Sequence, residues 1–265
     1  MNGIPLKKKL QSDAPVFGTV FNLVTTPSVV DVLPAKGLDF VIAMTEHTAL
    51  NLSDFLPLRW ALAGTGIACL ARVDSHDPMV ISKACDGFSD GVVVPYVEDV
   101  THLKRMIAAA KCRPLAGAAR EHLITSGEWP SDKTKAYVEA KCAETVFVAM
   151  IESVTAIENL DAICSVSGLD AIFVGPNDLT MTMGIPEERD SREFVDTLQH
   201  VIDTAQKHGV AAGAHFSKIE HGKRLVQQGA RFIPYSSDMR LIQHGIPAWL
   251  TALRGEAHFG SERIL

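Results

Sequence analysis

The stretch IFVGPNDLTM, residues 172–181, joins a run of large apolar side chains to a turn and then to a second apolar run. Its first three residues are typical of a strand buried on both faces, and Gly175-Pro176 is a strong turn signal. The polar pair Asn177-Asp178 therefore follows directly after a strand end. Such an Asp either belongs to an ordinary surface turn or takes part in a functional site. The residues at the other strand ends distinguish these two alternatives.

Eight short apolar runs alternate along the chain with longer segments whose apolar residues recur every three to four positions. Strands that alternate with helices pair in parallel and are buried on both faces. Eight of them in 265 residues match an α/β protein of the (β/α)8 TIM barrel type. An open doubly wound sheet is the alternative, but no G-x-G-x-x-G follows the first run. The expected strands are 16–23, 40–44, 68–73, 91–97, 146–152, 171–176, 210–216 and 231–237.

The composition indicates a sizeable core and a mildly acidic surface. Hydrophobic residues make up 47%, and 25 Lys and Arg against 31 Asp and Glu give a formal net charge of −6. This balance gives no support for a nucleic-acid partner, and a small-molecule substrate remains open. No window approaches the roughly 18 apolar residues of a membrane helix, and the basic N-terminal cluster lacks the apolar segment of a signal peptide.

Five cysteines without paired spacing are typical of free thiols in a reducing compartment. We therefore expect a cytoplasmic protein with no membrane partner. Residues 114–145 are too long for a standard connection, so we expect an excursion over the barrel mouth or into a subunit contact. No domain boundary is evident, and we expect one domain over residues 1–265.

In such a barrel the functional residues gather at the carboxyl ends of the strands. Each residue found there also has an ordinary structural interpretation, such as a helix cap for the acidic ones or an ion pair for the arginine. Their joint placement on one mouth nevertheless favours a functional site. The residues at the ends of the expected strands are Glu46, His47, Arg72, Glu152, Asn177, Asp178 and His215.

Two carboxylates from adjacent strands, Glu152 and Asp178, suit a hard divalent cation such as Mg²⁺ or Mn²⁺ because no Cys or His cluster accompanies them. An incomplete protein shell leaves room for a chelating 2-oxo acid. Arg72 would share the negative charge of an enolate, and His47 is the candidate for proton transfer. No lysine lies at the end of an expected strand, so a Schiff-base aldolase has no evident nucleophile.

Six short motifs follow one another in order: EH at 46–47, R-x-x-x-x-D-P at 72–78, VVVP at 92–95, IES at 151–153, NL at 159–160 and GPNDL at 175–179. With these motifs the chain, from about Phe17 to Leu241, resembles the HpcH/HpaI family of class II aldolases. Such enzymes cleave 4-hydroxy-2-oxo acids to pyruvate and an aldehyde. The resemblance implies a barrel of the pyruvate/phosphoenolpyruvate type and a homo-oligomer, as a hexamer or trimer of dimers. Its C-terminal helix, here PAWLTAL (247–253), would pack onto a neighbouring subunit.

The resemblance also assigns roles in catalysis. It implies that Glu152 and Asp178 bind the divalent metal, which is Mg²⁺ or Mn²⁺, with Co²⁺ as a further possibility. It implies that His47 moves a proton from the 4-hydroxyl group and that Asp86, in KACDGF, orients this imidazole. Arg72 would hold the oxo group and steady the enolate.

For substrate binding the resemblance implies Arg72 together with the turn that follows the sixth strand. Gly175 would turn the backbone so that the N–H groups of Asn177 and Asp178 hold the substrate carboxylate. We add His215, which stands at the end of the seventh strand where relatives usually have an apolar residue. The expected partner is therefore a small 2-oxo acid.

Other departures from the family pattern are Met44 in place of a carboxylate, Met150 in place of a Gln, and GAAR at 117–120 in place of G-[IV]-R-G, so that Arg120 replaces the family arginine or lies one position away from it. These changes leave two alternatives to the aldolase. One is a lyase for a malyl- or citryl-CoA thioester, although no Lys/Arg cluster follows the strand ends. The other is a non-catalytic relative that binds an oxo acid or a metal.

Overall fold

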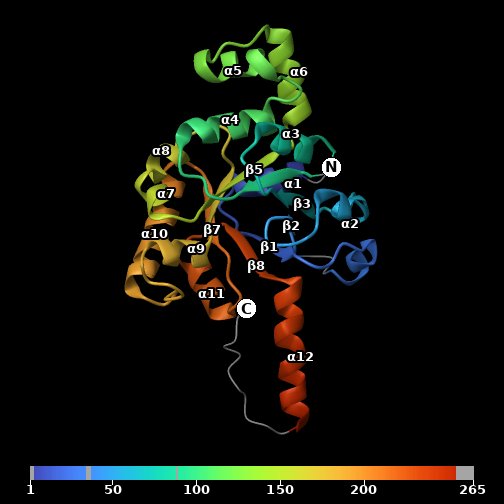
Figure 1. Ribbon diagram of the computed structural model, residues 1–265, viewed down its shortest axis with the longest axis vertical. Coiled ribbons are helices and arrows are strands. Elements are labelled where there is room, and N and C mark those ends of the chain that lie inside the picture. The colour runs from blue at the N-terminus through green and yellow to red at the C-terminus, as the bar shows by residue number, and fades with distance from the viewer. Residues whose placement is uncertain (1–2, 34–36, 88, 255–265) are drawn as a thin grey trace.

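Eight parallel strands form a single sheet in the order β7-β6-β5-β4-β3-β2-β1-β8 (Figure 1). The computed structural model describes residues 3–33, 37–87 and 89–254. β1 pairs with both β2 and β8, and a parallel bridge between Phe216 and Tyr235 brings the end of β7 against β8. The sheet is thus nearly closed, which confirms the expected (β/α)8 barrel. The strands are β1 Val16–Phe21, β2 Phe40–Met44, β3 Ala68–Arg72, β4 Gly91–Val94, β5 Val146–Ile151, β6 Ala171–Val174, β7 Ala211–Ala214 and β8 Phe232–Ser237.

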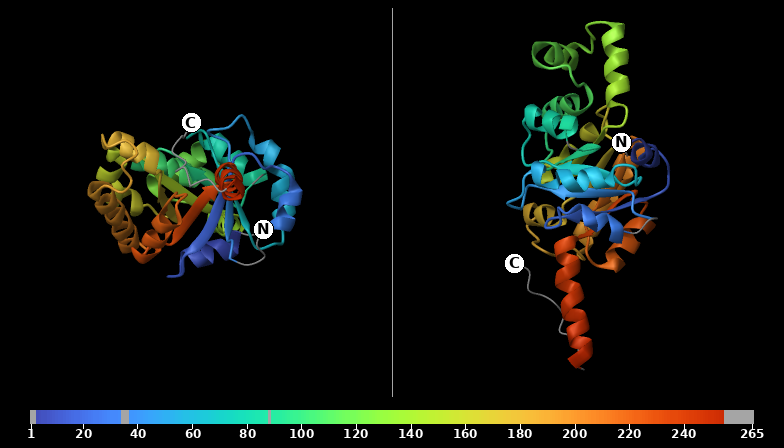
Figure 2. Two further views of the ribbon diagram at one scale, coloured as in Figure 1. Left: turned by 90° about the horizontal axis from the view of Figure 1, so that it is seen from below. Right: turned by 90° about the vertical axis from the view of Figure 1, so that its right-hand side faces the viewer.

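Helices connect the strands and cover the outside of the barrel (Figures 1 and 2). Two short 3-10 segments, η1 (Pro27–Val32) and η2 (Leu52–Phe55), precede the first covering helix. The α-helices are α1 Gly3–Leu10, α2 Leu56–Leu62, α3 Pro78–Gly87, α4 Val100–Lys111, α5 Gly117–Ser126, α6 Asp132–Cys142, α7 Val154–Glu158, α8 Leu160–Cys164, α9 Pro176–Thr182, α10 Arg192–Lys207, α11 Ile219–Gln227 and α12 Asp238–Arg254.

Side chains fill the interior of the barrel, so it is a packed core rather than a pore. Phe40 and Phe232 stack there with ring centroids 4.4 Å apart. Gly18 on β1 makes room for the Phe40 ring, which a Cβ at this position would overlap. Leu6 and Leu10 of α1 belong to the same buried cluster, so α1 closes the end of the barrel opposite the carboxyl ends of the strands.

The strand expected over residues 91–97 ends early, at Val94. Pro95 follows, and proline has no N–H with which to continue the ladder. Tyr96 then has a φ of 49°, a left-handed conformation that is uncommon for a residue other than glycine. The chain therefore leaves the sheet at Pro95 and turns the Tyr96 backbone in a new direction.

The segment 114–145 forms α5 and α6, which pack on α4 and project at the top of Figure 1. Arg105 of α4 pairs there with Glu121 of α5 at 3.3 Å. The expected excursion over the barrel mouth is therefore wrong, because the segment leads from the end of α4 to the start of β5, at the other end of the barrel. The alternative, a subunit contact, stays a prediction.

Helix α12 projects from the opposite side of the barrel (Figures 1 and 2) and contains the expected helix 247–253. Among its residues only Asp238 is buried, and large apolar side chains such as Trp249 are exposed. Its packing on a neighbouring subunit stays a prediction. The expected single domain runs to residue 265, and residues 255–265 lie outside the described part of the chain.

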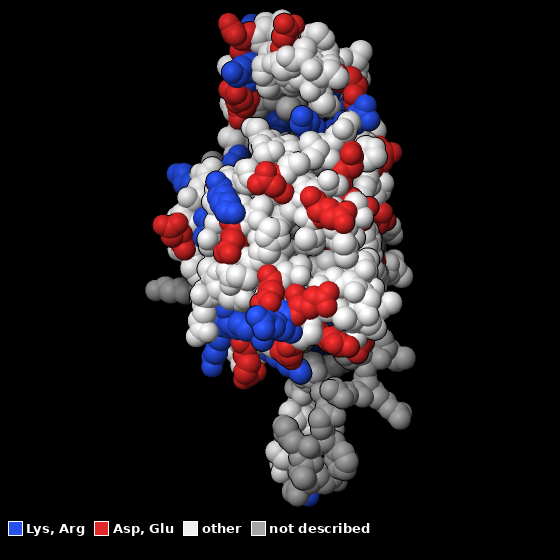
Figure 3. Space-filling view, turned by 90° about the vertical axis from the view of Figure 1, so that its left-hand side faces the viewer, with Lys and Arg blue, Asp and Glu red and all other residues white. Residues whose placement is uncertain are grey.

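The described surface carries charges of both signs. On the face in Figure 3, Lys and Arg side chains lie among Asp and Glu side chains rather than in one continuous basic stripe. Among the described helices, none has both the length and the apolar character that a membrane-spanning helix needs.

Candidate active site

Glu152 directly follows Ile151, the last residue of β5. Ile151 pairs with Val174, the last residue of β6, so the ends of these two strands lie side by side. Its side chain is buried, with the residue only 2% exposed. Oε2 accepts the Tyr96 N–H at 2.9 Å, whereas Oε1 is buried without a hydrogen-bond partner. Ser153, not Glu152, caps α7, by accepting the N–H of Ala156. The capping interpretation of Glu152 is therefore wrong.

Gly175 is the residue of β6's turn that packs against this carboxylate. A Cβ on Gly175 would lie 2.9 Å from Glu152 Cγ and closer still to Oε1. Any larger side chain would displace the carboxylate. The glycine is therefore needed for close approach as well as for the turn.

Asp178 lies in the first turn of α9, beside Glu152. The Tyr96 hydroxyl donates to Asp178 Oδ1 at 3.4 Å, while the Tyr96 N–H binds Glu152. The N-cap of α9 is Gly175, and no side chain caps this helix, so Asp178 is not its capping residue. One tyrosine thus contacts both predicted metal ligands, and the structure brings these two carboxylates together.

The α9 turn also presents backbone donors. The first hydrogen bond of the turn runs from the Leu179 N–H to the Gly175 carbonyl at 3.0 Å. The N–H groups of Asn177 and Asp178 precede it, and N–H groups of a first helical turn have no acceptor within the helix. These donors lie beside the two carboxylates, where the family resemblance expects a substrate carboxylate.

Arg72, at the end of β3, completes the charged group. Its Nε and Nη2 each lie 2.7 Å from Glu46 Oε2, and Nη2 lies 3.7 Å from Glu152 Oε1. His47 is half exposed, and its Nε2 lies 3.9 Å from Glu46 Oε1. Glu46 therefore connects the predicted oxo-group residue with the predicted proton-transfer residue.

Burial controls the ionisation of Glu152. It raises the pKa of this carboxyl to about 7, against the opposing effects of Arg72 and of the Tyr96 N–H. Nearby Asp178 and Glu46 raise it further. A perturbed carboxyl at a strand end is typical of a functional site.

His215 follows β7, and its Nε2 lies 3.1 Å from the Ser236 carbonyl on β8. Because a carbonyl only accepts, the neutral imidazole carries its proton on Nε2 and keeps Nδ1 as an acceptor. Burial lowers the pKa of His215 to about 4, so the ring is neutral near pH 7. His215 thus lies at the same mouth as the carboxylates but brings no charge to it.

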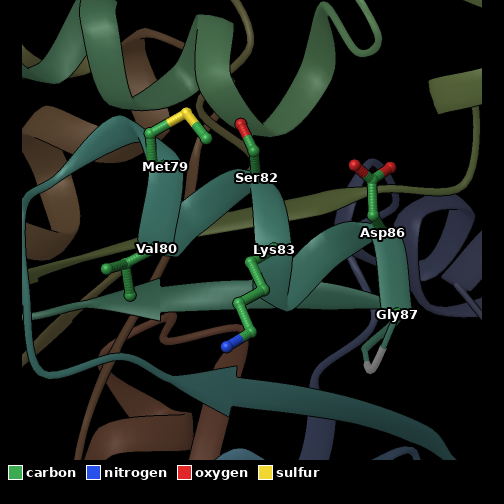
Figure 4. Close-up of a pocket in the computed structure, with 6 residues that line it drawn as sticks. All are labelled: Met79, Val80, Ser82, Lys83, Asp86 and Gly87. Atoms are coloured by element: carbon green, nitrogen blue, oxygen red, sulfur yellow. The ribbon is translucent and has the colours of Figure 1, made fainter.

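Asp86 does not lie beside His47 within this chain. It lies in the last turn of α3, where its carboxylate binds Arg113 Nη1 at 3.0 Å. Figure 4 shows Asp86 and Gly87 at one end of α3 and Met79 at the other. Since α3 runs back from the end of β3 to the start of β4, it carries Asp86 to the opposite end of the barrel. The expected pairing of His47 with Asp86 is therefore not formed within one chain.

A shallow hollow of about 620 Å³ lies along this helix, and its lining is mostly apolar (Figure 4). It is formed by Met79, Val80, Ser82, Lys83, Asp86 and Gly87. It contains none of the residues at the strand ends, so it is not the candidate active site.

Two residues of the site had no assigned role in the sequence. In the sequence motifs Glu46 appears only as the neighbour of His47, and the apolar pattern places Tyr96 inside the expected strand 91–97. Pro95 is the signal that could have placed Tyr96, because a proline after a buried strand marks the point where the chain leaves the sheet.

A nearly closed barrel with acidic, basic and imidazole groups at the carboxyl ends of its strands is typical of a (β/α)8-barrel enzyme. Residues 19–245 match the model of the HpcH/HpaI aldolase/citrate lyase family, and the chain belongs to this family. This match confirms the resemblance found in the motifs. The chain is accordingly an enzyme that cleaves carbon–carbon bonds, and the non-catalytic alternative is not supported.

Individual relatives agree with this assignment. The chain is 26% identical to a 5-keto-4-deoxy-D-glucarate aldolase of Escherichia coli O157:H7, over 83% of this chain and 85% of that protein. An HpcH/HpaI aldolase structure from Desulfitobacterium hafniense is 26% identical, with a TM-score of 0.81 and coverage of 96% and 98%. The structure of the citrate synthase SbnG is 25% identical, with a TM-score of 0.79 and coverage of 95% and 98%.

Proposed function

We propose that this protein is a divalent-metal-dependent aldolase that cleaves a 4-hydroxy-2-oxo acid to pyruvate, or a related 2-oxo acid, and an aldehyde. One observation carries the proposal. Glu152 Oε1 is buried without a hydrogen-bond donor, beside Asp178 and next to the Arg72 guanidinium. A buried oxygen of this kind is costly unless a ligand satisfies it.

The residues present fit a hard cation. Glu152 and Asp178 would hold it through carboxylate oxygens, which Mg²⁺ and Mn²⁺ prefer. In the described chain no group of three His, Cys, Asp or Glu side chains could hold a metal ion, so the protein would leave coordination positions for water and substrate. When bound, such a cation supplies Lewis-acid polarisation of a 2-oxo group.

The chain's own residues would bind and polarise the 2-oxo acid. The N–H groups of Asn177 and Asp178 donate to its carboxylate, and Gly175 gives them room beside Glu152. Arg72 donates to the 2-oxo oxygen and opposes the negative charge that develops there. Glu46 holds Arg72 in place for this role, because it binds two nitrogens of the guanidinium.

We assign proton transfer to His47. As it takes the 4-hydroxyl proton, the electron pair of that O–H bond forms the aldehyde C=O bond and the C3–C4 bond breaks. The electron pair of the broken bond forms the C2–C3 double bond, and the 2-oxo oxygen takes the negative charge. The protonated His47 then gives its proton to C3, directly or through water, which forms the methyl group of pyruvate and restores the neutral imidazole. Glu46, rather than Asp86, is the carboxylate that lies near this imidazole within the chain.

The experiment is turnover of 4-hydroxy-2-oxo acids with pyruvate formation as the readout, including 5-keto-4-deoxy-D-glucarate, the compound named for the relatives. We expect activity with Mg²⁺ or Mn²⁺, loss after exhaustive chelation and recovery when metal is returned. Undiminished activity after chelation would contradict the metal role.

A CoA-thioester lyase is the second candidate, and the similarity to a citrate synthase structure favours it. The mixed charges on the face in Figure 3 offer CoA no continuous basic surface there. Calorimetric titration with CoA separates the two candidates. Micromolar binding of CoA together with failure of every 4-hydroxy-2-oxo acid would replace the aldolase proposal by the thioester lyase.

We also propose that the protein is a homo-oligomer in which α12 packs on a second copy. The support is its exposed apolar side chains, which are typical of an interface rather than of a free surface. They are Leu241, Ile242, Ile246, Trp249 and Leu253. Light scattering of the full chain tests this proposal, and a monomer at micromolar concentration would contradict it.

A further inference from the structure

Tyr96 takes a left-handed backbone conformation without the freedom of a glycine. Its φ is 49°, and this conformation is unfavourable for a large side chain, whereas glycine adopts it readily. The ring does not belong to the core, because Tyr96 is 43% exposed. Packing therefore does not account for a tyrosine at this position. Strained residues of this kind cluster at functional sites.

The turn that carries Tyr96 is held by its neighbours. The Pro95 carbonyl accepts a hydrogen bond from His76 Nε2 at 2.6 Å, and the Val97 N–H donates to the Met150 carbonyl at 3.2 Å. Because a carbonyl only accepts, the His76 ring carries a proton on Nε2. These two bonds tie the turn after β4 to the loop after β3 and to β5, so the position of Tyr96 is fixed before any ligand binds.

Tyr96 contacts one oxygen of each predicted metal ligand. Its N–H binds Glu152 Oε2 at 2.9 Å, and its hydroxyl, which keeps its proton near neutral pH, donates to Asp178 Oδ1 at 3.4 Å. The second oxygen of each carboxylate is not engaged in this way. Glu152 Oε1 has no hydrogen-bond partner, and no described residue binds Asp178 Oδ2. Each carboxylate thus keeps a single oxygen for a cation.

The number of oxygens that a carboxylate offers affects the choice of cation. Mg²⁺ demands a nearly ideal octahedral geometry and keeps several waters, which suits carboxylates that bind through one oxygen. Ca²⁺ takes about six to eight oxygen ligands and accepts carboxylates that bind through both oxygens. A residue that occupies the second oxygen of a carboxylate therefore favours the smaller cation over the larger one.

We propose that Tyr96 is a positioning residue that selects Mg²⁺ or Mn²⁺ over Ca²⁺ at this site, because it holds Glu152 and Asp178 as ligands through one oxygen each. Its backbone N–H acts on Glu152, and its hydroxyl acts on Asp178. The inference rests on the metal role in the proposed function and adds to it a determinant of cation choice. Tyr96→Phe keeps the ring and the N–H and removes only the hydroxyl.

The test is calorimetric titration of Mn²⁺, Mg²⁺ and Ca²⁺ into the metal-free protein without substrate. The variants are Tyr96→Phe and Tyr96→Asn. Asparagine tolerates the left-handed conformation, and its side chain is much shorter, so Tyr96→Asn loses the same contact with Asp178 in a less strained turn. Tyr137→Phe is the control, because Tyr137 lies exposed on α6. Thermal denaturation checks that each variant is folded.

We expect each Tyr96 variant to bind Mn²⁺ and Mg²⁺ about 10-fold more weakly, as for other residues that orient a metal ligand. Ca²⁺ binding should be unchanged or tighter, so the ratio of the Ca²⁺ Kd to the Mn²⁺ Kd should fall about 10-fold. A purely structural role would weaken all three cations equally. That result, or an unchanged ratio, would overturn the inference. A shift in Tyr96→Asn that is missing in folded Tyr96→Phe would also overturn it, because the ring rather than the hydroxyl would then be responsible.

The binding experiment separates this inference from the aldolase proposal. Cation binding is measured without turnover, so a shifted ratio supports the role of Tyr96 even if no 4-hydroxy-2-oxo acid is cleaved. Metal-dependent cleavage together with an unchanged ratio in both variants contradicts the role of Tyr96 and leaves the aldolase proposal intact. If the wild type binds none of the three cations, the metal role and this inference are both wrong.

Discussion

Arg72 is held by Glu46 through two nitrogens, Nε and Nη2, each 2.7 Å from Glu46 Oε2. The same guanidinium lies 3.7 Å from the buried Glu152 Oε1. Glu46 thus takes up much of the positive charge of Arg72 and fixes the direction of its side chain. This arrangement leaves Glu152 Oε1 without a hydrogen-bond donor, although a cation stands beside it.

Glu46→Gln should lower kcat about 10–100-fold, which is the range expected when a residue that supports an active-site group is changed. The amide keeps the shape of Glu46 but binds the guanidinium weakly, so Arg72 can turn toward Glu152. Steady-state kinetics on the best substrate checks this. Glu139→Gln is the control, because Glu139 lies on α6 in an exposed pair with Lys135. An unchanged kcat in Glu46→Gln would show that Arg72 does not depend on Glu46.

Gly175→Ala should weaken metal binding and turnover together. The new Cβ would lie 2.9 Å from Glu152 Cγ, so the carboxylate must move. We expect a loss of stability of about 1–3 kcal/mol, typical of overpacking a filled site. Urea denaturation and Mn²⁺ titration measure the two effects. Gly87→Ala, at the exposed end of α3, is the control, because a Cβ there has no atom within 4 Å beyond its chain neighbours and its own helix backbone. Normal Mn²⁺ affinity in Gly175→Ala would contradict the close packing.

The raised pKa of Glu152 predicts a pH dependence for the metal-free protein. Folding raises this pKa from 4.5 to about 7, so the folded chain holds the proton more tightly. The resulting stabilisation is fully present below pH 4.5 and is lost as the pH rises through 7. Glu152→Gln should therefore be more stable than the wild type at pH 8, by on the order of 1–3 kcal/mol, and much less so at pH 5.

Urea denaturation in the presence of a chelator measures this difference. Saturating Mg²⁺ should stabilise the wild type more at pH 8 than at pH 6, because a protonated carboxyl must lose its proton before it binds metal. It should not stabilise the variant. A stability difference between Glu152→Gln and the wild type that is the same at pH 5 and pH 8 would show that the Glu152 carboxyl does not titrate in this range.

Substitution of Asp238, at the same barrel mouth, should strongly lower the stability of the fold. Its buried carboxylate accepts the backbone N–H groups of Asn22, Leu23, Val24 and Met239 at 2.7–2.9 Å. Asp238→Ala leaves these donors unsatisfied and should destabilise the protein by about 2–5 kcal/mol. Thermal denaturation checks this, and a change below about 0.5 kcal/mol, as for an ordinary surface residue, would contradict it.

The barrel could be predicted from the sequence because its strands are buried on both faces. Each apolar run, such as the one that ends at Val174, predicts a strand, and eight such runs predict a closed barrel. The strand ends then placed Glu152 and Asp178 at one mouth, as the structure has them.

The remaining parts of the site depend on geometry that no local pattern encodes. Tyr96 contacts both carboxylates only because its backbone takes a positive φ after Pro95. Arg189 reaches Asn177 from the loop after α9, a position that no strand end in the sequence indicates. Asp86 was assigned by resemblance alone, and the direction of α3 separates it from His47 in the same chain.

Exchange of pyruvate methyl protons in D2O, followed by NMR with Mg²⁺, Mn²⁺, Co²⁺ or no metal, tests the central claim most directly. It requires the 2-oxo acid site and the metal ligands but no knowledge of the aldehyde. We predict exchange that needs a divalent cation, stops on chelation, and falls more than about 100-fold in Glu152→Gln and Asp178→Asn, beyond the effect of changing an outer residue. Exchange that continues undiminished without metal, or in these two variants, would contradict the account.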